Sequence, residues 1–156
     1  MIKLIDNALL DAVCAEAQAS PRGRKNRNFH PRDDHPAHRL LNAIEPGSYV
    51  PPHRHNDANK DETMLVLRGA LGLVEFDTEG QVLRASRLTP AGPLLGCDIP
   101  HGTYHSVLAL EPGTLFLEAK GGPYAPLTAE EQATWAPREN ESGAEDYYRR
   151  LVALFD

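Results

Sequence analysis

The stretch GSYVPPHRHNDANKDETMLVLRG, residues 47–69, decides how this chain of 156 residues folds. His53 and His55 are two positions apart, and in an extended segment side chains at that spacing point to the same face. Both imidazoles can then reach one ion. The carboxylate of Glu62, at the start of an apolar run, can approach that ion from the side. The stretch therefore predicts a metal site built on neighbouring β segments.

A second histidine motif, PHGTYH, follows at residues 100–105. His105 comes three residues after Gly102, which lies in a turn begun by a proline. Because His105 opens a strand-like run, it can point into a barrel and supply another ligand, while Tyr104 should face the opposite way. The predicted metal ligands are therefore His53, His55, Glu62 and His105.

Around these motifs the chain has the pattern of a mainly β domain with helical ends. Short apolar segments alternate with turns rich in Gly and Pro, as in an antiparallel sandwich or barrel. The expected strands are 39–44, 62–68, 70–76, 81–88, 94–99, 105–110 and 114–119. Apolar spacing predicts a helix over 7–19, and two capping-box sequences predict short helices over 128–135 and 146–155. The segment 21–38 lacks periodicity, and we expect it to be a loop.

Length and composition indicate one globular domain, 1–156, made of a helix and basic loop (1–38), a barrel (39–120) and a helical tail (121–156). The chain has no apolar run of eighteen residues, and its first twenty residues lack a basic start followed by an apolar block. A cytoplasmic location with no membrane partner is therefore expected. The net charge of -6 argues against nucleic-acid binding.

Positive charge is concentrated in residues 21–32 in spite of the acidic balance. The basic residues of this run are Arg22, Arg24, Lys25, Arg27 and Arg32. The run is either a solvated basic loop or an anion site over the barrel mouth. In such a site the guanidinium groups would bind carboxylate or phosphate through paired hydrogen bonds. In the second interpretation Arg24, Lys25 and Arg27 are the candidate anion-binding residues, because they lie at its centre.

The two histidine motifs together resemble the paired signatures of the cupin superfamily. The first signature is Gly, five residues, His-x-His, three or four residues, Glu, six residues and Gly. It is matched at Gly47, His53, His55, Glu62 and Gly69. The loop before Glu62 is longer than in the signature, so Asp57 and Asp61 are alternative carboxylate ligands, although the spacing to Gly69 favours Glu62.

The second signature is matched less completely. Pro100, Gly102 and His105 are in place, whereas the leading Gly and final Asn positions hold Leu94 and Ala109. Over nearly its whole length the chain also resembles the WbuC-type cupin-fold metalloproteins. That resemblance rests on the leading helix, the segment SPRGRKNRNFH at 20–30, the long His-x-His loop and the tail around Trp135-Ala136-Pro137.

The resemblance implies a single cupin jelly roll with one divalent transition metal, such as Fe, Mn, Zn or Ni, and a link to surface-polysaccharide biosynthesis. A metal-dependent enzyme would act on a small anionic, sugar-derived substrate by isomerase, epimerase, lyase or oxygenase chemistry, with His101 or Tyr49 as candidate acid or base. The alternative is a non-catalytic module that binds or senses a small ligand. A homodimer is expected by analogy with other cupins.

Overall fold

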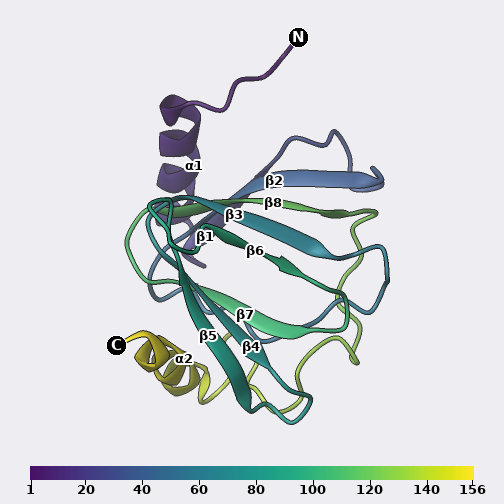
Figure 1. Ribbon diagram of the computed structural model, residues 1–156, viewed down its shortest axis with the longest axis vertical. Helices are drawn as coiled ribbons and strands as arrows, with labels where there is room; N and C mark the ends of the chain where they lie inside the picture. The colour runs from purple at the N-terminus through teal and green to yellow at the C-terminus, as the bar shows by residue number, and fades with distance from the viewer.

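The computed structural model describes residues 1–156 and contains two antiparallel sheets that face each other (Figure 1). The five-stranded sheet has the order β1-β2-β8-β3-β6, and the three-stranded sheet has the order β5-β4-β7. The strands are β1 (Arg24–Asn28), β2 (Ala37–Ile44), β3 (Glu62–Arg68), β4 (Leu71–Phe76), β5 (Val82–Leu88), β6 (Gly96–Ile99), β7 (Tyr104–Ala109) and β8 (Thr114–Gly121). The predicted mainly β jelly roll of the cupin type is confirmed.

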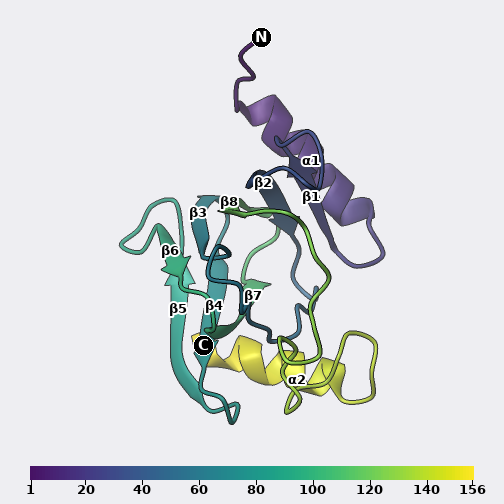
Figure 2. The ribbon, with the colours of Figure 1, turned by 90° about the vertical axis from the view of Figure 1, so that its right-hand side faces the viewer.

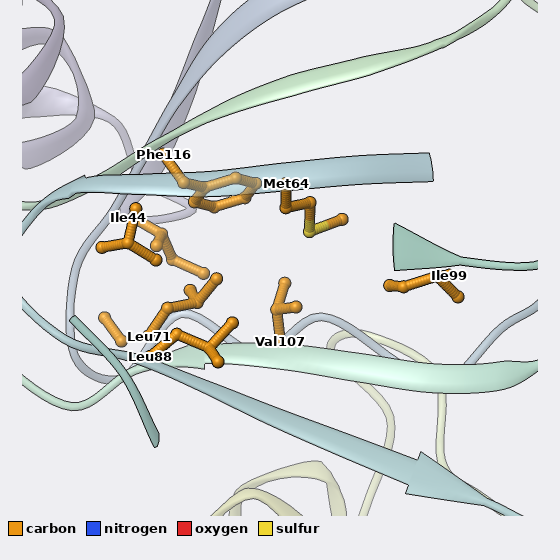
Figure 3. Close-up of a cluster of buried hydrophobic side chains, with 9 residues drawn as sticks. Ile44, Met64, Leu71, Leu88, Ile99, Val107 and Phe116 are labelled. Atoms are coloured by element: carbon orange, nitrogen blue, oxygen red, sulfur yellow. The ribbon is translucent and has the colours of Figure 1, made fainter. Parts of the chain in front are cut away.

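The space between the two sheets holds an apolar core (Figure 3). Its buried members are Ile44, Met64, Val66, Leu71, Leu88, Ile99, Val107, Ala109 and Phe116. Side chains alternate between the two faces of a strand, so β3 contributes Met64 and Val66 to this core and β7 contributes Val107 and Ala109. Met64 and Phe116 come from the five-stranded sheet and meet Leu71 and Val107 of the three-stranded sheet (Figure 3). This apolar packing holds the two sheets together independently of any bound group.

Two helices cover the outer faces of the sheets (Figure 2). Helix α1 (Asn7–Ala19), predicted over 7–19, is capped by the Asp6 side chain, which accepts from the Leu9 N–H at 2.9 Å. Its apolar side packs against β2 and β8. Helix α2 (Ala144–Val152), followed by the 3-10 turn η1 (Ala153–Phe155), packs against the three-stranded sheet. Neither helix has the length and apolar character needed to cross a lipid bilayer.

Two segments differ from the sequence-based expectation. Residues 24–28, expected within a loop, form β1, an edge strand paired with β2 from Arg24↔Ile44 to Asn28↔Leu40. Residues 128–135, expected to be helical, form turns, because their backbone groups bond to a distant segment. The Ala133 N–H donates to the Pro52 carbonyl, and the Glu131 carbonyl accepts from the Arg54 N–H.

Gly69 joins the two sheets at the end of β3, where the sequence predicts a bend. Its φ is 70°, in the left-handed region, and an added Cβ would lie 2.5 Å from Thr114 Oγ1. Only glycine fits this conformation and this contact without strain. A register shift between Val66 and Arg68 precedes it. The bend carries the chain from β3 into β4 and fixes which residues of β3 face the interior.

Candidate metal centre

The segment that carries the two early histidines lies between β7 and the C-terminal tail. The His53 N–H donates to the His105 carbonyl at 3.0 Å, and the His105 N–H returns a bond to the His53 carbonyl at 2.9 Å. On its other side His53 forms a bridge with Gln132. Hydrogen bonds on both sides hold the segment extended, so His53 and His55 share one face, as their spacing predicts.

The structure brings the four predicted ligand residues together. His55 Nε2 lies 2.9 Å from Glu62 Oε1, and His105 Nε2 lies 3.1 Å from Glu62 Oε2. The ring centroid of His53 is 4.6 Å from that of His105 and 5.3 Å from that of His55. One ligand atom from each of His53, His55 and Glu62 lies within 4.8 Å of the others.

The hydrogen bonds of the imidazoles leave their inner nitrogens free to act as ligands. His53 Nδ1 contacts the Pro51 carbonyl at 3.0 Å, and His105 Nδ1 contacts the Thr103 carbonyl at 2.9 Å. A carbonyl only accepts, so Nδ1 carries the proton and the Nε2 lone pair faces the cluster.

Three atoms of the cluster are buried without a hydrogen-bond partner: His55 Nε2, His105 Nε2 and Glu62 Oε2. Buried polar atoms are normally satisfied, and unsatisfied ones that converge on one point need an explanation. A divalent cation at this point would satisfy them all. Imidazole nitrogens with one carboxylate oxygen form a donor set suited to a transition metal ion. The residues present therefore fit such an ion.

The electrostatic environment favours the protonation states that a metal requires. Burial lowers the pKa of His53 to about 3, and the neighbouring His105 adds to the effect, so the His53 imidazole is neutral. Burial opposes ionisation of Glu62, but the close nitrogens of His105 and His55 and the Lys120 ammonium outweigh it and hold the pKa of Glu62 well below its usual range. A neutral imidazole and an ionised carboxylate are the ligand forms of these side chains.

The alternative carboxylates lie outside the cluster. The Asp57 side chain is exposed and accepts from the Asn59 N–H. The Asp61 side chain is half exposed and accepts from the backbone N–H of His101 at 2.7 Å. The Glu62 side chain, by contrast, is only 3% exposed. Adjacent residues of a strand point to opposite faces, which explains why Glu62 faces inward and Asp61 outward.

The structure does not bring the two candidate acid–base residues to the cluster. His101 Nδ1 lies 2.7 Å from Asp61 Oδ1 in an exposed pair. Tyr49 packs between the three-stranded sheet and the tail, and its hydroxyl donates to the Pro137 carbonyl at 2.7 Å. Burial raises the pKa of Tyr49, so its hydroxyl stays protonated.

The predicted anion-binding residues do not all line the same cavity. Arg24 and Lys25 line a cavity of about 400 Å³ that is also lined by His53, Glu62 and His105. Arg24 forms an ion pair with Glu139 of the tail. Arg27 pairs with Glu16 of α1 and does not line the cavity. The basic segment is thus a fixed edge at the cavity rim, with Arg27 directed away from it.

Sequence reasoning missed the polar residues that line this cavity. Glu118 and Lys120 on β8 and Asn42 on β2 all contribute to its wall. A signal for two of them was present in the sequence, because Glu118 and Lys120 continue the inward phase of Phe116 at intervals of two residues.

The fold is of the cupin type, and the inward-facing set of histidines and a carboxylate forms a candidate metal centre. The sequence pattern of one family matches residues 5–88, and the chain belongs to that family, which is described as a domain of unknown function, DUF6016. A comparison with curated proteins finds no match.

Several solved structures share the fold. KdgF from Halomonas sp. is 24% identical, with a TM-score of 0.50 over 68% of this chain and 84% of KdgF. The conserved protein SPY1581 of unknown function from Streptococcus pyogenes is 14% identical, with a TM-score of 0.53 over 80% of this chain and 91% of that one. At these identities the similarity concerns the fold alone.

Proposed function

We propose that this protein is a cupin metalloprotein that holds one divalent transition metal ion and binds a small anionic ligand beside it. The proposed ligands are His53, His55, Glu62 and His105. The observation that carries the proposal is the convergence of buried, unpartnered imidazole nitrogens on the Glu62 carboxylate. Fe, Mn, Zn and Ni all accept such a donor set.

The surrounding residues would prepare the site for a ligand. An ion of this kind, when bound, polarises a ligand oxygen and lowers the pKa of a bound water. The carbonyls of Pro51 and Thr103 hold the imidazole tautomers, and the Glu131 carboxylate lies 3.7 Å from His55 Nδ1. The basic rim at Arg24 and Lys25 would raise the local concentration of anions.

We further propose a metal-dependent reaction on a sugar-derived anion, of the isomerase, epimerase, lyase or oxygenase class, within surface-polysaccharide biosynthesis. The resemblance to the WbuC-type cupins supports this pathway, and the cavity beside the cluster supports a small ligand. The second candidate is a binding or sensing module, which is favoured by the positions of Tyr49 and His101 away from the cluster. Product formation from a panel of acidic sugars, assayed with the metal-loaded protein, would distinguish the two.

The metal assignment is tested by elemental analysis of protein purified without added metal. We expect close to one transition metal ion per chain. The variant His53→Ala/His55→Ala should lose it and keep a β-rich circular dichroism spectrum, because the apolar core is separate from the cluster. Retention of the full metal content in that variant would refute the assignment.

A matched pair of variants tests the choice of carboxylate. Glu62→Gln should weaken zinc binding strongly, whereas Asp61→Asn should leave it near the wild-type value, because only Glu62 faces the imidazoles. A larger loss of zinc affinity in the Asp61 variant would show that the phase of β3 is misassigned.

A further inference from the structure

A row of polar side chains crosses the inner face of the five-stranded sheet. Phe116, Glu118 and Lys120 alternate along β8 and share its inward face. Lys120 is paired with Glu62 on β3, and Phe116 is paired with Asn42 on β2. Lys120 Nζ lies 3.2 Å from Glu62 Oε1 and 3.0 Å from Glu118 Oε1. Asn42 Nδ2 donates to Glu118 Oε2, so the row is continuous from the metal cluster to β2.

Folding alone does not account for this row. Glu118 is only 6% exposed, and its Oε1 has no hydrogen-bond partner of good geometry. Burying charged groups is costly, and apolar residues of similar volume are often at least as stabilising. The Lys120 ammonium has three N–H groups and only two neighbouring carboxylates. Both side chains therefore keep hydrogen-bonding capacity beyond what their mutual contacts use.

The unused capacity lies along a cavity that leads to the metal cluster. The cavity, of about 400 Å³, is lined by Glu118 and Lys120 together with His53, His105 and Arg24. Its apolar wall is formed by Ile44, Val50, Met64, Val107 and Phe116. A volume of this size, with a few polar groups on an apolar wall, is typical of small-molecule sites.

We propose that Lys120, Glu118 and Asn42 form a subsite that anchors a polyhydroxy carboxylate, such as a sugar acid, beside the metal centre. The carboxylate of the ligand accepts from the Lys120 ammonium, one hydroxyl donates to Glu118 Oε1, and the carbon chain lies against the apolar wall. This subsite rests on the proposed function, because the ligand would occupy the cavity next to the bound ion.

The hydrogen-bonding groups of Lys120 and Glu118 favour a polyhydroxy carboxylate over related ligands. Glu118 only accepts, so it needs a hydroxyl donor, and it disfavours a dianionic ligand more than a monocarboxylate. A fatty acid supplies no hydroxyl donor to Glu118 Oε1. A neutral sugar alcohol supplies no carboxylate to accept from the third N–H of the Lys120 ammonium. A phosphate would place a dianion next to the Glu118 carboxylate.

The test is calorimetric titration of the zinc-loaded protein with D-gluconate, hexanoate and sorbitol. Gluconate has both groups, hexanoate lacks the hydroxyls and sorbitol lacks the carboxylate. We expect gluconate to bind at least about tenfold more tightly than either. Glu118→Gln and Lys120→Met should each lower gluconate affinity by at least about tenfold. The control Glu111→Gln, in an exposed ion pair with Arg87, should bind like the wild type.

Zinc content measured on the same samples separates the two proposals. Zinc retained in Glu118→Gln together with unchanged gluconate affinity would overturn the subsite and leave the metal centre intact. A wild-type protein that takes up none of Zn, Fe, Mn and Ni would overturn the proposed function. Gluconate binding by the metal-free wild type and by Glu118→Gln would then decide the subsite. If Glu118→Gln does not unfold cooperatively, Asn42→Ser tests the same row, and equal gluconate binding by it would refute the proposal.

Discussion

Glu139→Gln should destabilise the protein and loosen its C-terminal tail, because Glu139 joins the tail to the β1 edge of the cavity. Its carboxylate accepts from Arg22 Nε at 2.9 Å and Nη2 at 2.7 Å, and from Arg24 Nη2 at 2.7 Å. Hydrogen bonds from Arg22 lower the pKa of Glu139 most, partial burial acts in the opposite direction, and Arg24 adds to the lowering. The resulting pKa is about 2, compared with an ordinary value of 4.5.

The size of the effect follows from this pKa and from the exposure of the groups. At about 1.4 kcal/mol per pKa unit, the lowering corresponds to at most about 3.5 kcal/mol. The Arg22 side chain is 61% exposed, so solvent screens much of this energy, and we expect a loss of about 1–2 kcal/mol. Because the folded-state pKa is lowered, the stabilisation is fully present above pH 4.5 and is lost as the pH falls towards 2.

Urea unfolding at pH 7 and at pH 3.5 measures both the size and the pH dependence. At pH 7 the free energy of unfolding of Glu139→Gln should be lower than that of the wild type by about 1–2 kcal/mol. In a separate thermal scan its melting temperature should be lower by about 2–8 °C. At pH 3.5 the difference in free energy of unfolding between Glu139→Gln and the wild type should be smaller than at pH 7. Glu130→Gln, an exposed change of the same type in the same tail, serves as the control. Equal stability of Glu139→Gln and wild type at pH 7, or a gap that does not narrow, would refute the reasoning.

Two further changes probe the centre and the core. Glu131→Gln should weaken zinc binding about tenfold, because the Glu131 carboxylate lies 3.7 Å from His55 Nδ1 and its charge favours a proton on that nitrogen, which leaves Nε2 for the ion. Competition with a chelating dye would show this. Unchanged zinc affinity would mean that Glu131 has no part in holding His55. Leu71→Ala, at a fully buried position, should cost about 2–5 kcal/mol in urea unfolding. Leu83→Ala, at a position 61% exposed, should cost less than about 0.5 kcal/mol, and similar losses in the two variants would contradict the assigned core.

The parts of the fold that could be predicted are those with a local physical signature. Apolar runs separated by turn residues marked seven of the strands, and their predicted bounds differ by only a few residues from the observed ones. Apolar spacing predicted α1, which Asp6 caps in the structure. The grouping of His53, His55 and Glu62 followed from strand alternation and from the spacing to Gly69, whose left-handed backbone fixes the phase of β3.

The parts that escaped prediction depend on contacts between distant segments. Strand β1 has no apolar alternation, because it is an edge strand held by backbone bonds to β2 and by ion pairs with Glu16 and Glu139. The capping-box sequence at Thr128 predicts a helix, yet the backbone of this segment bonds to residues 52 and 54 instead. Local propensity is weak beside such tertiary bonds.

The position of the histidine segment also constrains the order in which the protein assembles during synthesis. His53 and His55 are made early, but their extended conformation depends on bonds to residue 105 and to residues 131–133. Closing such long loops is slow compared with forming local contacts. Before those partners leave the ribosome, the nascent chain carries a flexible His-x-His segment with little geometric selectivity for an ion. Discrimination among metals at the proposed centre therefore requires synthesis at least as far as residue 133.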